Sequence, residues 1–186
     1  MHRLFIAIEL PLPEREDLLR LCNGVPGARW AELDQLHLTL RFVGEVDGAT
    51  FDDIVQALAG VRAEAFDFRL EGVGRFPPRG PTRILWVGVA PSERLVTLRN
   101  RVEAAVTGAG LKPDGRKFHP HVTLVRLKSS PGARVARYLA EKAGYRSGPI
   151  RVGAFHLFSS HLGQRRASYR IEATYRLEES PGGEAS

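Results

Sequence analysis

The feature of this sequence that most constrains its fold is a tetrapeptide that occurs twice, as HLTL beginning at His37 and as HVTL beginning at His121. Each copy lies in a short run with the alternation of a β-strand, where side chains two positions apart point to one face, about 6 to 7 Å apart. His37 therefore pairs with Thr39, and His121 with Thr123. Two such strands side by side would place two imidazoles and two hydroxyls around one small anion.

The two tetrapeptides lie in matching contexts, which indicates an internal duplication. A predicted strand at 3–10, a helix and then His37 are echoed by a predicted strand at 83–90, a helix and then His121. A duplication would give two lobes related by a pseudo-twofold axis. We therefore expect an α+β, bilobal duplicated fold, with mainly antiparallel sheets lining a central cleft and helices outside, in a single domain over residues 1–177.

Periodicity and turn residues place the other elements. Helices are expected from Glu14, from a capping box of Thr50 and Asp53, after Ser92 and from Ser130; strands are expected at 66–70, 150–158 and 169–177, with a turn at 161–166. The Pro-, Gly- and Arg-rich segment 74–83 is expected to be a loop, either an ordinary connection or a mobile basic flap. Trp86 is expected in the core, and residues 178–186 as a flexible tail.

Charge and cysteine content limit the class of partner. The 186 residues carry a net charge of +6, with a pI near 10.0, mainly from arginine. This favours an anionic partner such as phosphate, although a basic balance is also compatible with a merely solvated surface. The single cysteine, Cys22, excludes an intrachain disulfide and a Cys-based metal site, and indicates a reducing, cytoplasmic setting. We expect a monomer that does not bind membranes.

Two arginines close to the motifs are candidates for substrate binding. On a strict period of two, Arg41 lies on the face of His37 and Thr39. Arg126 lies on the face opposite His121 unless the strand is bulged. The predicted strand face supports Arg41 and leaves Arg126 open, and a plain surface charge is the alternative for either side chain.

Two aromatic residues and a third histidine are further candidates for substrate contact. Phe42 and Phe118 are placed to stack a base, although aromatic residues beside a strand more often belong to the core. His119 shares a face with His121 and forms a His-x-His spacing that zinc can use. No Asp, Glu or Cys lies close in sequence to complete the shell, and threonine is a poor zinc ligand. We therefore expect no metal and no other cofactor.

Four segments, RLFIAIELP, HLTLRFVGEV, ILWVGV and FHPHVTLVRLK, resemble the 2H phosphoesterases, specifically the RNA 2',3'-cyclic phosphodiesterases, also called 2'-5' RNA ligases. The similarity extends over about residues 1–177, with Val125 where the family often has Ala. It implies one HxTx motif per lobe and metal-independent hydrolysis of RNA 2',3'-cyclic phosphate ends, or of cyclic nucleotides, to 2'-phosphomonoesters. It also implies His37 as proton donor, His121 as proton acceptor, and reverse 2'-5' ligation as a side activity.

The chemistry itself explains why two histidines would be needed. An imidazole, with a pKa of about 6.5, exists in both protonation states near neutral pH, and in-line attack and departure require one on each side of phosphorus. Thr39 and Thr123 would donate hydrogen bonds to the non-bridging oxygens. Two alternatives remain open: a non-catalytic nucleotide- or RNA-binding module that uses the same cleft, and two strand histidines that only stabilise the fold.

Overall fold

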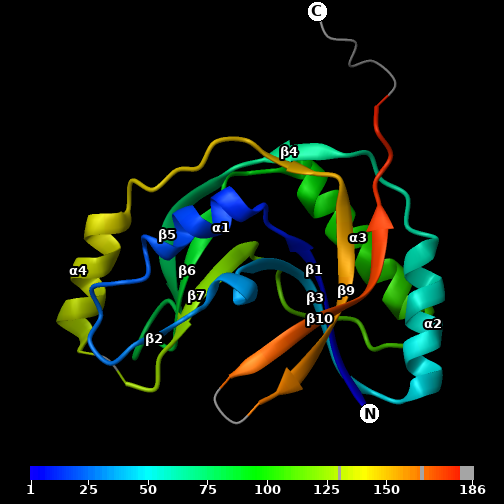
Figure 1. Cartoon of the computed structure of the whole chain (residues 1–186), viewed down its shortest axis with the longest axis horizontal. Coiled ribbons are helices and arrows are strands. Elements are labelled where there is room, and N and C mark those ends of the chain that lie inside the picture. Colours follow the sequence, from blue (N-terminus) through cyan, green and yellow to red (C-terminus); the bar gives the residue numbers. More distant parts are fainter. Residues whose placement is uncertain (130, 164–165, 181–186) are drawn as a thin grey trace, which may run out of the picture.

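Two four-stranded antiparallel sheets form the centre of the computed structural model, which describes residues 1–129, 131–163 and 166–180 (Figure 1). The elements are β1 (His2–Glu9), α1 (Leu12–Leu19), β2 (Arg29–Trp30), the 3-10 helix η1 (Leu33–Gln35), β3 (His37–Val46), α2 (Gly48–Ala59), β4 (Phe66–Phe68), β5 (Leu70–Phe76), β6 (Ile84–Val89), α3 (Glu93–Gly108), β7 (His121–Arg126), α4 (Gly132–Lys142), β8 (Ile150–Val152), β9 (Ala154–Leu162) and β10 (Ala167–Arg176).

The sheet topology repeats the pattern seen in the sequence. One sheet has the order β10-β9-β1-β3 and the other β2-β7-β6-β5, while β4 and β8 form a separate pair. In each large sheet the histidine strand pairs antiparallel with the strand that opens its half, β3 with β1 and β7 with β6. Helices α2 and α3 lie at one side of the sheets and α4 at the other (Figure 1). The predicted α+β fold with antiparallel sheets is confirmed.

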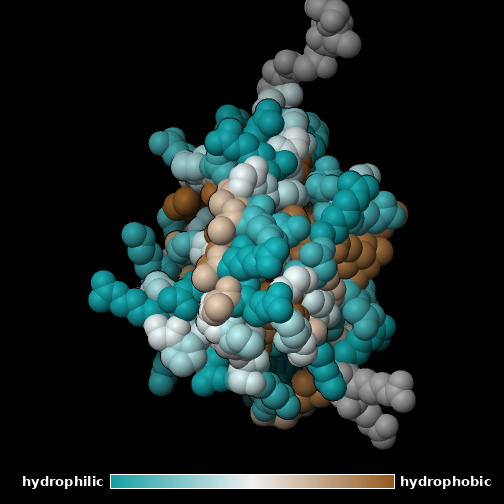
Figure 2. Space-filling model, turned by 90° about the vertical axis from the view of Figure 1, so that its left-hand side faces the viewer, coloured by the Kyte–Doolittle hydropathy of each residue, from teal (hydrophilic) through white to brown (hydrophobic). Residues whose placement is uncertain are grey.

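The core is continuous beneath the two sheets and the helices. Alternation holds in β1, where Leu4, Ile6 and Ile8 enter this core, and the apolar stripe of α3 is fully buried as predicted. Phe5, on the other face of β1, is also buried, because it packs in a second small cluster with Phe158. The outer face that carries α4 is mostly hydrophilic (Figure 2), as expected of a surface exposed to water.

Helix α2 begins earlier than predicted. Asp47 is its N-cap, and its side chain accepts a hydrogen bond of 2.8 Å from the backbone N–H of Thr50. The expected capping box of Thr50 and Asp53 is therefore wrong, since both residues already lie inside the helix.

Residues 77–83 form the hairpin connection between β5 and β6, and the loop prediction is wrong for residues 74–76, which belong to β5. Strand β5 continues to Phe76, and the Arg75 guanidinium holds the turn by donating to the carbonyls of Pro78 and Gly80 and to the Thr82 hydroxyl. These bonds favour an ordinary ordered turn over a mobile flap.

Trp86 lies outside the core in which it was expected. Its indole ring is only partly buried, lies across Gly74 and packs against Phe76 at 5.3 Å between centroids. A Cβ at Gly74 would lie 2.2 Å from the ring, so only glycine fits there. The reason is the register of the sheet: Trp86 is paired with Thr123 and shares its face.

The expected flexible tail does not begin at residue 178. The backbone N–H of Glu178 donates to the Ala63 carbonyl, and Glu179 forms an ion pair of 2.7 Å with Arg151. Three parts of these predictions lie outside the described residues: the helix start at Ser130, residues 164–165 of the turn, and residues 181–186 of the tail.

No helix in the described part of the chain is long and apolar enough to cross a membrane.

Candidate active site

A single cleft of about 1190 Å³ is lined by both histidine–threonine pairs. His37 and Thr39 reach it from β3, and His121 and Thr123 reach it from β7. Further lining residues come from β1 and β10 on one side and from β2 on the other. The duplicated motifs therefore meet at one cavity, as the pattern of the sequence predicts.

A β-bulge in β3 decides which side chains follow His37 into the cleft. Thr39 and Arg41 pair with consecutive residues of β1, so Leu40 is an extra residue in the ladder. The bulge reverses the alternation beyond it. Arg41 turns toward the interior, and Phe42 turns into the cleft.

A matching bulge occurs in β7. Thr123 and Val125 pair with consecutive residues of β6, so Leu124 is the extra residue. Val125 is therefore buried, and Arg126 lines the cleft. The sequence left the face of Arg126 open, and the bulge places it on the side of His121.

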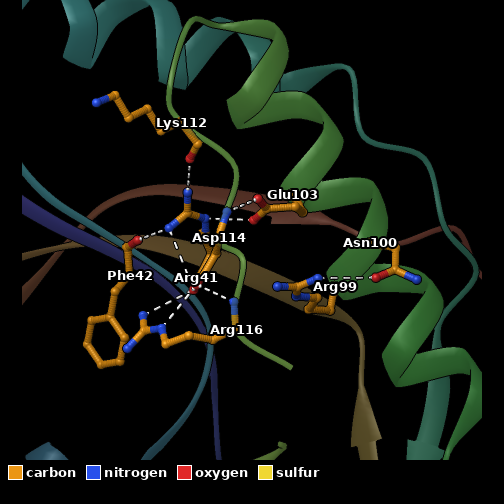
Figure 3. A network of polar contacts seen from close by, with 8 residues as sticks. All are labelled: Arg41, Phe42, Arg99, Asn100, Glu103, Lys112, Asp114 and Arg116. Carbon is orange, nitrogen blue, oxygen red and sulfur yellow. Dashed lines mark hydrogen bonds and ion pairs between the residues drawn. The ribbon is translucent and has the colours of Figure 1, made fainter. Parts of the chain in front are cut away.

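Arg41 is a structural residue, which corrects its prediction as a substrate ligand. Its side chain is only 9% exposed and is held by groups from three segments (Figure 3). It contacts the Glu103 carboxylate (Nε to Oε2, 2.6 Å), the Phe42 carbonyl (2.7 Å), the Lys112 carbonyl (2.6 Å) and the Asp114 carboxylate (3.8 Å). These contacts connect β3 with α3 and with the loop that leads into β7.

The same network fixes Arg116, a cleft residue that the sequence analysis missed. Asp114 accepts two hydrogen bonds from the Arg116 guanidinium, at 3.0 and 3.1 Å, and its pKa is lowered to about 2, mainly by this contact (Figure 3). Arg116 also lines the cleft. Its position in a loop, outside any periodic pattern, left no sequence signal.

Both catalytic candidates are oriented by a backbone carbonyl two residues upstream. Nδ1 of His121 lies 2.6 Å from the His119 carbonyl, and the Gln35 backbone accepts a hydrogen bond from His37. In each ring this contact assigns the proton to one nitrogen and leaves the other available to a ligand. The two motifs are thus equivalent in orientation as well as in sequence.

The ring of His37 is packed among aromatic side chains. Its neighbours, by centroid distance, are Phe5 (4.8 Å), Tyr169 (5.3 Å) and Phe158 (6.2 Å). The pKa of His37 is lowered to about 4, mainly by burial and to a smaller extent by the electrostatic effect of His121 and Arg126. Burial also lowers the pKa of His121. Both rings are therefore neutral at pH 7 in the free protein.

His119 and Phe118 lie away from the cleft lining, contrary to their prediction as substrate ligands. The His119 ring packs against Trp86 at 4.8 Å, and only its carbonyl serves the site, through His121. Phe118 packs on the core, with the Arg99 guanidinium 5.4 Å from its ring. Both residues precede the start of β7, so the alternation of the strand does not govern them.

Two other cleft residues, Arg29 and Tyr169, were not singled out from the sequence. Tyr169 starts the predicted strand at 169–177, but only the pairing of β9 with β10 brings it to His37. Arg29 comes from β2, which is too short for a periodic signal. No group of three His, Cys, Asp or Glu side chains suited to a metal ion occurs within residues 1–129, 131–163 and 166–180.

Comparison with known proteins agrees with this architecture. A sequence profile described as the 2'-5' RNA ligase superfamily matches residues 17–164. Proteins named RNA 2',3'-cyclic phosphodiesterase are similar: that of Aeropyrum pernix is 36% identical over 80% of this chain and 85% of its own, and that of Archaeoglobus fulgidus is 32% identical over 90% and 96%. The crystal structure of Escherichia coli LigT complexed with 3'-AMP superposes with a TM-score of 0.79 at 27% identity, covering 95% of this chain and 98% of LigT. The chain therefore belongs to the 2'-5' RNA ligase superfamily.

Proposed function

We propose that the protein hydrolyses RNA 2',3'-cyclic phosphate ends to 2'-phosphomonoesters without a metal ion, and that it can run the reverse 2'-5' ligation. The observation that supports this most directly is the meeting of both His-x-Thr pairs in one cleft. Relatives named for this activity, and LigT crystallised with 3'-AMP, support a nucleotide substrate.

In the proposed reaction, His121 accepts a proton from water as the water oxygen attacks phosphorus. The bond between phosphorus and O3' breaks, and the departing oxygen takes a proton from His37. One proton is taken up and one is released, so each turnover converts a cyclic diester and water into a 2'-phosphomonoester. Thr39 and Thr123 donate hydrogen bonds to the non-bridging oxygens as charge grows on them.

Electrostatics explain how a histidine with a pKa of about 4 can act as the acid. Burial is the main cause of the lowered pKa of both histidines in the free protein, and the charge of Arg126 adds to it. A bound phosphodiester anion opposes this effect, because a nearby negative charge favours the imidazolium form. The substrate anion therefore raises the pKa of His37 and favours its protonated form in the complex.

The test is incubation with a nucleoside 2',3'-cyclic phosphate in excess chelator, with products identified by phosphorus NMR. We expect a 2'-phosphomonoester, and losses of about 100-fold or more in kcat for His37→Ala and for His121→Ala. His2→Ala, which removes an exposed imidazole outside the cleft, serves as the matched control. Binding of the nucleotide by the wild type without any turnover would instead establish the non-catalytic module.

A further inference from the structure

The two motif histidines are oriented in the same way, but the segments that carry their orienting carbonyls are held differently. His121 depends on the carbonyl of His119, whose ring packs against Trp86 of the neighbouring strand β6. His37 depends on the carbonyl of Gln35, the last residue of η1, whose side chain bonds to a residue 132 positions further along the chain. The orientation of His37 is therefore linked to a distant part of the chain, whereas that of His121 is held locally.

The side-chain amide of Gln35 uses its acceptor and its donor in two different directions. Its Oε1 accepts a hydrogen bond of 3.1 Å from the backbone N–H of Glu32, which completes the capping box of η1. Its Nε2 donates a hydrogen bond of 3.1 Å to the carbonyl of Ala167, the first residue of β10. Exchanging the amide oxygen and nitrogen would set donor against donor and acceptor against acceptor. The two contacts thus fix a single orientation of the amide.

The main chain of Gln35 is held as well as its side chain. Its N–H donates to the carbonyl of Glu32 at 2.9 Å, and Leu36, the next residue, is 1% exposed and packs in the core. The peptide group between Gln35 and Leu36 carries the carbonyl that accepts the hydrogen bond from His37. This peptide group is therefore anchored by the core on one side and by the Gln35 amide on the other.

The hairpin of β9 and β10, orange in Figure 1, is the element to which η1 is anchored. The Arg166 guanidinium contacts the carboxylates of Glu32 and Asp34, the latter at 3.4 Å, which joins the hairpin to η1 a second time. Further along β10, Tyr169 packs edge-on against the His37 ring, at 5.3 Å between centroids. The hairpin thus contacts both the ring of His37 and the segment that orients this ring.

We propose that Gln35 is a positioning residue for proton transfer at His37, because its amide fixes, against this hairpin, the carbonyl that orients the ring. The imidazolium of the proposed reaction has two N–H groups. The one bonded to the Gln35 carbonyl keeps its proton, and the other passes its proton to the departing O3'. Without the amide contacts the carbonyl is no longer fixed, so the neutral ring can exchange tautomers and turn away from the leaving oxygen. This inference rests on the proposed hydrolysis for its kinetic consequence only.

The test variant is Gln35→Met, which keeps the length of the side chain, carries no charge and removes both amide contacts. Nitrogen NMR of the His37 ring near neutral pH should show one tautomer in the wild type and a mixture of two in the variant. With a nucleoside 2',3'-cyclic phosphate, kcat should fall about tenfold and KM should change less than about twofold, because only the acid loses its orientation. Gln56→Met, on the exposed face of α2, is the matched control.

A second variant, Gln35→Glu, separates the two amide contacts. A carboxylate still accepts from the Glu32 N–H but cannot donate to the Ala167 carbonyl, so this variant should give a mixture of tautomers as well. The ring signals come from folded molecules, so partial unfolding does not alter the proportion of the tautomers.

Three results would contradict the proposal. A single tautomer in Gln35→Met, or a raised KM with unchanged kcat, would overturn the positioning role of Gln35. A single tautomer in Gln35→Glu alone would overturn the role of the hairpin. Absence of wild-type hydrolysis would overturn the proposed function, whereas the tautomer measurement would still decide whether Gln35 orients His37.

Discussion

The low pKa of His37 predicts a specific dependence of stability on pH. In the unfolded chain a histidine titrates near 6.5, whereas the buried ring titrates at about 4. Between these values the unfolded state binds more protons than the folded state, so stability falls as pH falls through this window and is retained above it. The full shift corresponds to about 3 kcal/mol, of which about 2 kcal/mol is lost by pH 5.

The assay is urea unfolding at pH 8 and pH 5 for the wild type and for His37→Asn, which keeps a polar side chain that does not titrate. The wild type should lose about 2 kcal/mol more than the variant between the two pH values. His2→Asn controls for the loss of an exposed imidazole on β1. Equal losses in the wild type and His37→Asn, or a ring signal that titrates near 6.5 in proton NMR, would refute the argument that burial holds His37 neutral.

Four further predictions follow from the packing and the charges. Arg41→Ala should cost about 3 kcal/mol in urea unfolding, because the mostly buried Glu103 carboxylate loses its ion pair, whereas replacing both residues by apolar ones should recover most of the loss. Gly74→Ala should cost about 1–3 kcal/mol in the same assay, because its Cβ meets an indole ring. Tyr138→Phe should cost about 1 kcal/mol on the same scale, through loss of its hydrogen bond to the Leu21 carbonyl. The optimum of kcat/KM should lie below pH 6.5, and that of kcat at higher pH, since the bound phosphate raises the histidine pKa values.

The sequence predicts the architecture well because the signals involved are local and redundant. Alternation in β1, the apolar stripe of α3 and the repeated His-x-Thr-Leu together indicate the two halves and their meeting point. Arg116 and Tyr169 were missed because a loop and a strand pairing bring them to the cleft from distant positions. Trp86 was misplaced because a half-buried face that lines a cleft has the same apolar pattern as one that faces the core.

Phe42, rather than Arg41, is the side chain that follows Thr39 into the cleft, which shows a limit of predicting strand faces from a period of two. A period of two assigns every second residue to one face, but a single extra residue reverses the assignment beyond it. The bulges at Leu40 and Leu124 lie at the same position in both motifs, immediately after the threonine. Their effect is to bury the first residue after the bulge, so that the next residue reaches the cleft. Each motif therefore brings a histidine and a threonine into the cleft, followed by one further side chain, which is Phe42 after the first bulge and Arg126 after the second.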